Sequence, residues 1–121
     1  MHSSMYKMVM RGDTINTQFK KGVLELIVLL CVSKKDMYGY ELIEKVSKVV
    51  DVNDGTIYPL LKRLTNEKYA DTYLEESTEG PPRKYYKITV LGTARLQELI
   101  DSWTTFATSV NQFIKESEKH D

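Results

Sequence analysis

Cysteine and histidine are almost absent from this chain of 121 residues. The single cysteine, Cys31, lies in an apolar helical pattern, so no intrachain disulfide can form and nothing points to an oxidising compartment. The two histidines, His2 and His120, stand at opposite ends of the chain, and neither a metal-ligand spacing nor a phosphate-binding glycine motif occurs. We therefore expect no enzyme, no metal site and no cofactor.

Long hydrophobic runs are also missing. The most apolar stretch, residues 23–32, is interrupted by Glu25 and is shorter than the roughly 20 residues that a membrane span requires. The first residues lack the apolar segment and small-residue cleavage pattern of a secretory signal. These absences favour a cytoplasmic protein, and the length suits a single domain.

An excess of charge of one sign is missing as well, because 17 lysines and arginines balance 17 aspartates and glutamates. This balance disfavours a protein that coats nucleic acid non-specifically. The charges are nevertheless sorted along the chain. Glu75, Glu76 and Glu79 precede residues 80–87, which carry cations and no acid. A local basic surface is therefore predicted within residues 80–87.

Residues 54–64 have the pattern of an amphipathic helix. At about 100° per residue, an apolar stripe lies opposite a face with aromatic, proline and basic side chains. The stripe is Ile57, Leu60, Leu61 and Leu64, and the opposite face is Gly55, Tyr58, Pro59 and Lys62, flanked by Thr56 and Arg63. Asn53 suits the N-cap, which puts Pro59 beyond the first turn, where its ring crowds the carbonyl of Gly55. A start at Thr56 is the alternative register and places Pro59 in the first turn.

Further periodicities predict the order of the elements. Helices are expected at 17–33 and 39–50, and strands at 69–74 and 85–89, joined by a stiff basic turn at 80–86. A last helix is expected after an N-cap at Thr89, to about residue 116. This order predicts a winged helix-turn-helix, a mainly α fold with a small β-hairpin (α+β). The predicted parts are an arm or short helix at 1–15, the winged helix-turn-helix at 16–89 and a dimerisation helix at 90–121.

The last predicted helix carries more apolar surface than a core of this size can cover. Its apolar side chains alternate at three and four residue steps. The stripe consists of Leu96, Leu99, Ile100, Trp103, Phe106, Val110, Phe113 and Ile114. Because an exposed apolar surface of this length needs a partner, we predict that these residues form a homodimer interface with a second copy of the helix.

The motifs resemble those of the PadR family of bacterial transcriptional regulators, specifically its short members with a single C-terminal helix. The resemblance rests on GVLELIVLLCV at 22–32, YGYELIEKV at 38–46, GTIYPLLKRL at 55–64, GPPRKYYKIT at 80–89 and Trp103. Lys68 and Tyr69 depart from it, since the family often has a glycine and an apolar residue there. The resemblance implies a dimeric repressor that binds an inverted repeat and releases it when a small molecule, often aromatic, is present.

The 54–64 helix and the basic turn together suit binding to double-stranded DNA, the helix in a major groove and the cations on phosphates. The predicted DNA contacts are Tyr40, Asn53, Thr56, Tyr58, Pro59, Lys62, Arg63, Gly80, Arg83 and Lys84. Either Tyr38 or Tyr40 is equally well explained as a packing residue. The alternatives are a helix face that docks on another protein, and a hairpin whose cations pair with Glu75, Glu76 or Glu79.

Trp103 is the sharpest candidate for a ligand contact, because a flat indole in a self-associating helix stacks well on a planar guest. Phe106 and Val110, one and two turns on, would line the same space. A core or interface anchor explains Trp103 equally well. Met8 and Met10 are candidates for adaptable cover over this site. We predict a small aromatic or hydrophobic effector.

Overall fold

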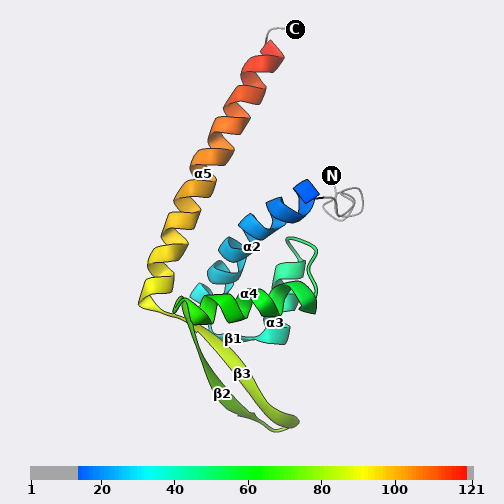
Figure 1. Cartoon of the computed structure of the whole chain (residues 1–121), viewed down its shortest axis with the longest axis vertical. Coiled ribbons are helices and arrows are strands. Elements are labelled where there is room, and N and C mark those ends of the chain that lie inside the picture. Colours follow the sequence, from blue (N-terminus) through cyan, green and yellow to red (C-terminus); the bar gives the residue numbers. More distant parts are fainter. Residues whose placement is uncertain (1–13, 120–121) are drawn as a thin grey trace.

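Four helices and a three-stranded antiparallel sheet make up the part of the chain described by the structure, a computed structural model (Figure 1). Residues 14–119 are described, with side chains from residue 22 onward. The elements are α2 (Thr14–Lys34), β1 (Met37–Tyr38), α3 (Gly39–Ser47), α4 (Asp54–Asn66), β2 (Ala70–Ser77), β3 (Gly80–Ile88) and α5 (Val90–Lys119). The predicted α+β winged-helix architecture is confirmed. The prediction for Met8 and Met10, and both histidines, lie outside the described residues.

The core forms around α2, which contacts α3, β3 and the start of α5. Its apolar side chains point to several sides, as predicted for a helix packed by others. The fully buried side chains are Leu24, Val28, Leu29, Leu42, Val46, Ile57, Leu61 and Leu64. No helix among residues 14–119 is long and apolar enough to cross a membrane.

The helix α4 starts in the first of the two predicted registers. Asn53 is its N-cap, and the Asn53 side chain accepts a hydrogen bond from the Thr56 amide at 3.2 Å. Pro59 lies inside the helix. The apolar stripe is directed into the core as predicted, while Gly55, Tyr58, Pro59 and Lys62 are exposed.

The end of α4 carries an unusual backbone conformation. Lys68 has a φ of 68°, in the left-handed region that favours glycine. The amide of Tyr69 donates to the carbonyl of Leu64, and the amide of Lys68 donates to that of Thr65. These two bonds close the helix in a Schellman motif. The sequence-based departure at Lys68 is therefore a lysine at a position where the backbone favours glycine.

The β2–β3 hairpin, the wing, projects from the helices at the end of the molecule opposite the C-terminus (Figure 1). The predicted turn at 80–86 is wrong in its position, because β3 begins at Gly80 and only Thr78 and Glu79 form the turn. Two prolines fit into β3 because the third strand pairs only with Tyr85 and Tyr86. At Pro81 and Pro82, β3 is therefore an edge strand, and the amide that proline lacks is not needed to pair with a third strand.

One short strand was not predicted, and one helix ends earlier than predicted. The two-residue strand β1 pairs Met37 with Tyr86 and Tyr38 with Tyr85, and its length is too short for a periodicity to reveal it. The helix α3 ends at Ser47 rather than residue 50, because the amides of Lys48 and Val49 donate hydrogen bonds to carbonyls three residues back, as in a 3₁₀ turn.

Thr89 is the N-cap of α5, as predicted, and its Oγ1 accepts a hydrogen bond from the Gly92 amide at 2.9 Å. The first turns of α5 pack on α2, and the rest of the helix extends away from the core (Figure 1). Leu96 is only 7% exposed and belongs to the core. The predicted dimer contact at Leu96 is therefore corrected, since α2 and its neighbours already cover this side chain.

Candidate nucleic-acid interface

The outward face of α4 presents a short set of polar and basic groups. Thr56, Pro59 and Lys62 are exposed, but Asn53 and Thr56 are also bonded to each other. The Thr56 hydroxyl donates to Asn53 Oδ1 at 3.3 Å, so both side chains stabilise the start of the helix. Among the described residues of this face, Lys62 is the cation that projects outward without an ion pair.

Tyr58 lies on the same face but is held against the next element. A Cβ atom on Gly39 would come within 2.6 Å of the Tyr58 ring and hydroxyl, so the ring packs directly on the glycine backbone. Tyr58 remains 42% exposed. The first turn of α3 therefore fixes the orientation of an aromatic side chain that the sequence pattern alone described as projecting freely.

Arg63 is turned away from this surface. Its Nη2 lies 3.1 Å from Oε1 of Glu25 on α2, and its Nη1 lies 2.9 Å from Oε1 of Glu67. Both bonds are intramolecular, and Glu25 is buried. The structure thus gives Arg63 a packing role within the chain, and the predicted DNA contact at this residue is left without a free guanidinium.

The outer face of the sheet carries a tyrosine cluster next to a cation. The rings of Tyr73 and Tyr85 stack with centroids 5.5 Å apart, and Tyr38 tilts against Tyr85 at the same distance. The guanidinium of Arg83 lies 4.6 Å from the centroid of the Tyr38 ring. Tyr38 is thus the packing residue of the pair considered from sequence, and Tyr40, with 61% of its surface exposed, is the outward one.

A hydrogen bond anchors this cluster to the short connection between α2 and β1. The Tyr73 hydroxyl donates to Oδ2 of Asp36 at 2.6 Å, which raises the pKa of Tyr73 to about 12 because ionisation would place two negative charges together. The wing is therefore tied to the helices at its base. The direction of the wing relative to α4 thus depends on a contact between Tyr73 and Asp36, which are far apart in the sequence.

The cations of the wing are free of carboxylate partners. Glu75 faces Arg83 across the strand ladder, but the guanidinium is turned to Tyr38, and no ion pair in the described chain joins Arg83 or Lys84 to Glu75, Glu76 or Glu79. Gly80 begins the strand and has open space around it. The alternative of a hairpin neutralised by its own acids therefore lacks the ion pairs it requires.

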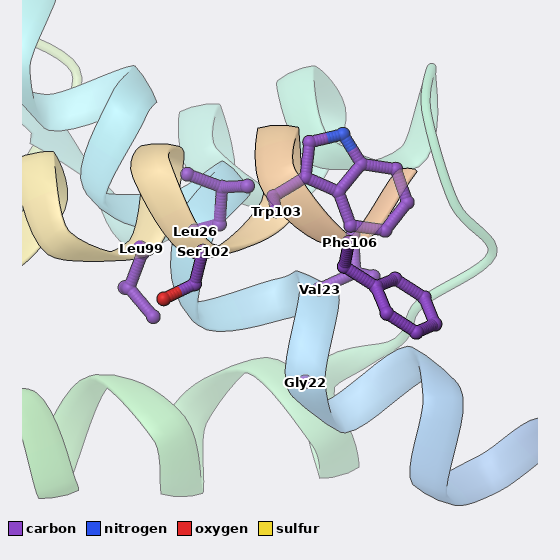
Figure 2. A pocket seen from close by; sticks show the side chains of 7 residues that line it. All are labelled: Gly22, Val23, Leu26, Leu99, Ser102, Trp103 and Phe106. Atoms are coloured by element: carbon purple, nitrogen blue, oxygen red, sulfur yellow. The ribbon is translucent and has the colours of Figure 1, made fainter. Parts of the chain in front are cut away.

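The exposed part of α5 borders a cavity of about 290 Å³ between α5 and α2 (Figure 2). Trp103 and Phe106, whose ring centroids are 6.4 Å apart, line it from α5. Gly22, Val23 and Leu26 of α2 complete the wall with Leu99 and Ser102. Val110 is not among the lining residues. The contribution of α2 was missed because residues 22–26 read from sequence as core.

From Trp103 onward, the large apolar side chains of α5 are exposed. Trp103, Phe106, Val110, Phe113 and Ile114 are each at least 41% exposed, whereas Leu99 and Ile100 pack partly against the core. The predicted interface therefore divides into an inner part, which the chain covers itself, and an outer part from Trp103 onward. Only the outer part is available to a partner along its full width.

Comparisons with known proteins agree with this architecture. The profile of the transcriptional regulator PadR-like family matches residues 28–98. An uncharacterised protein of Lysinibacillus sphaericus is 31% identical over 111 residues, which cover 88% of this chain and 97% of that protein.

Solved structures of PadR-like proteins superpose on most of the chain. The crystal structure of a PadR-like transcriptional regulator from Bacillus cereus is 43% identical with a TM-score of 0.74, covering 80% of this chain and 96% of that one. A PadR-like transcription factor from Bacteroides fragilis is 40% identical with a TM-score of 0.70, covering 84% and 99%. These relatives are regulators of transcription rather than enzymes. By its profile match, its fold and these relatives, the chain belongs to the PadR-like family of DNA-binding transcriptional regulators.

Proposed function

We propose that the protein is a homodimeric repressor, acting in the cytoplasm, that binds an inverted-repeat operator and leaves it when a flat hydrophobic molecule binds beside Trp103. The observation that supports this most strongly is that, within the described chain, neither the outward Lys62 of α4 nor Arg83 and Lys84 of the wing forms an ion pair. A groove-sized helix beside a basic hairpin suits a duplex, in which the helix reads bases and the hairpin contacts phosphates.

Dimerisation is supported by the outer part of α5. Five large apolar side chains from Trp103 to Ile114 are exposed on one helix that extends beyond the core. Exposure of this extent is costly in water, and a second copy of the same helix covers it by two-fold symmetry. Two recognition helices, the α4 helices of a dimer, would then enter successive major grooves about 34 Å apart.

Ligand release is supported by the cavity. It is lined mainly by apolar side chains of α2 and α5, and Trp103 offers a flat ring for stacking. A guest there would meet the two helices whose arrangement sets the position of the DNA-binding elements. Repression, rather than activation, follows the family resemblance described from the sequence.

Salt-dependent DNA binding tests the central part of this proposal. Duplexes selected from a random pool by the purified chain are titrated at several salt concentrations. Arg83→Ala should weaken binding and reduce the salt slope by about one phosphate contact. Lys115→Ala is the matched control, because Lys115 is an exposed cation on the far part of α5. Equal slopes for Arg83→Ala and the unmodified chain would remove the wing from the phosphate contacts.

The competing function is a protein-interaction module whose α4 face docks on another protein. The same selection separates the two, since a module would enrich no duplex at low salt even though it is dimeric in solution.

Fluorescence of Trp103 tests the effector. It is the only tryptophan of the chain, so quenching by a panel of planar aromatics reports this position alone. Phe106→Ala should weaken the quenching, while Phe113→Ala, an exposed ring farther along α5 that does not line the cavity, should leave it unchanged. Absence of quenching by every compound would contradict a ligand site at Trp103.

A further inference from the structure

Glu25 is a buried carboxylate that joins three helices. It lies on α2 with 7% of its surface exposed. Arg63 of α4 donates to its Oε1 from Nη2 at 3.1 Å, and Arg95 of α5 donates to its Oε2 from Nε at 2.9 Å and to Oε1 from Nη2 at 3.3 Å. We call these three residues the Glu25 clamp. Its partners lie 38 and 70 positions away in the sequence, so it is purely tertiary.

The electrostatics keep the clamp charged. Burial alone would raise the pKa of Glu25, but the hydrogen bonds and charges of Arg95 and Arg63 outweigh burial and hold the pKa below its ordinary value. On the outer sides of the two arginines, Glu67 accepts a hydrogen bond from Arg63 at 2.9 Å, and Glu98 forms an ion pair with Arg95 at 3.6 Å. The result is a row of alternating charges that runs from α4 across α2 to α5.

A second connection ties the same two outer helices at their ends. Thr89, the N-cap of α5, donates from its Oγ1 to the carbonyl of Lys68 at 2.7 Å, and its amide donates to the carbonyl of Tyr69 at 3.1 Å. Gly92 lies so close that a Cβ there would be 2.0 Å from the Tyr69 carbonyl oxygen. Leu96 also packs in the core, but such apolar contacts are not directional. The clamp adds directional hydrogen bonds that join α2 to both α4 and α5.

We propose that the Glu25 clamp is the positioning element that sets the angle between α4 and α5, and with it the separation of the two recognition helices. This inference rests on the proposed dimer, in which each α5 is the fixed frame and each α4 is carried by it. Lys62 touches DNA in this account, whereas Glu25, Arg63 and Arg95 act through the position of α4.

Directional hydrogen bonding explains why a charged group serves here rather than an apolar one. A well-packed hydrophobic cluster often stabilises a fold as much as a buried ion pair does, so stability alone does not require charge at this place. Bidentate contact between a guanidinium and a carboxylate fixes both distance and plane, which an aliphatic contact does not. Arg95 makes such a bidentate contact with Glu25.

The separation of the recognition helices is measurable without DNA. A nitroxide is attached to Lys62→Cys in a Cys31→Ala chain, and pulsed dipolar spectroscopy gives the distance between the two labels of a dimer. The chain with an intact clamp should give one narrow distribution. Glu25→Gln should broaden it and displace it by several ångströms. Glu67→Gln is the matched control, because it also removes a carboxylate charge that pairs with Arg63, but from the exposed side of that arginine.

A DNA readout accompanies the distances. Selection from random duplexes should give one half-site spacing for the intact clamp and a mixture of spacings for Glu25→Gln. Arg95→Lys, which keeps the charge but not the bidentate contact, should also broaden both readouts and serves if Glu25→Gln does not fold.

An unchanged, narrow distribution and an unchanged spacing in both clamp variants would overturn the inference while leaving the proposed dimer in place. Absence of any dipolar signal with the intact clamp would instead overturn the dimer, and the positioning role along with it.

Discussion

Lys62 and Arg63 are neighbours in the chain, yet their side chains leave α4 on different sides and meet different surroundings. Lys62 projects from the outward face without an ion pair in the described chain, whereas Arg63 reaches a buried carboxylate of α2 and an exposed one on its own helix. The same contrast holds between Arg83, which makes a cation–π contact with the Tyr38 ring, and Arg95, which forms an ion pair with Glu25. Cations on the outward side are available to a partner, and those on the inward side hold the scaffold that presents them.

The junction of α4 and α5 is where the inward side is most sensitive. Gly92→Ala should lower the free energy of unfolding by about 3 kcal/mol, because a Cβ cannot occupy the space beside the Tyr69 carbonyl without moving backbone. Gly22→Ala is the control, since that helical glycine has open space around it and alanine favours helix. Urea unfolding of both variants checks this, and equal stabilities would mean that the junction yields easily.

The clamp comes next in size. Glu25→Gln should lower the free energy of unfolding by about 2 kcal/mol at neutral pH. This is less than for a fully buried ion pair, because both arginines are partly exposed to water. The pKa of Glu25 is held below its ordinary value of 4.5, so its contribution is complete above that pH and is lost as the pH falls through the lower, folded-state pKa. The stability difference between the two proteins should therefore shrink below about pH 4.5.

Unfolding curves from pH 7 to pH 3 measure that difference. A gap that stays constant over this range would show that the Glu25 charge adds nothing to stability.

The neighbouring cations of α4 provide the sharpest contrast. Arg63→Ala should lower stability by about 1 kcal/mol and leave the salt slope of DNA binding unchanged, whereas Lys62→Ala should leave stability within about 0.5 kcal/mol and reduce the slope by about 0.9. Unfolding curves and salt titrations of both variants measure these effects. An equal fall in the salt slope of DNA binding for both variants would show that Arg63 also contacts phosphate.

The smallest effect is expected at Lys68, and it is a gain. Lys68→Gly should raise stability by about 0.5 kcal/mol, because glycine relieves the cost of a positive φ and loses part of that gain to chain entropy. Asn66→Gly, inside the last turn of α4, is the control and should bring no gain. A stability below that of the unmodified chain would mean that the Lys68 side chain has a role of its own.

Much of the fold could be predicted from the sequence, because its helices carry long and regular apolar patterns. The start of α5 could be predicted from Thr89, since a cap makes a local hydrogen bond. The sequence left two registers open for α4, and the hydrogen bond from the Thr56 amide to the Asn53 side chain shows which one forms. The wing's existence was predicted but its turn was misplaced. Gly80, Pro81 and Pro82 resemble a turn in isolation, and only the limited extent of β1 makes a strand possible there.

The candidate site could be predicted less completely, because its decisive contacts join residues far apart in the chain. Nothing in the local pattern distinguishes Arg63 from Lys62, since only the position of Glu25 in the fold separates them. Leu96 follows the same period as the other apolar residues of α5, yet its side chain is buried in the core. The tyrosine cluster, likewise, depends on the pairing of three strands.

The number of chains in the DNA complex distinguishes a dimeric repressor from a protein that binds DNA as a monomer. Light scattering of the purified chain, alone and with a duplex it has selected, gives the number of chains in each species. We expect a dimer in solution and two chains on one duplex, with α5 joining them. A single chain on each duplex, together with a monomer in solution at micromolar concentration, would contradict it.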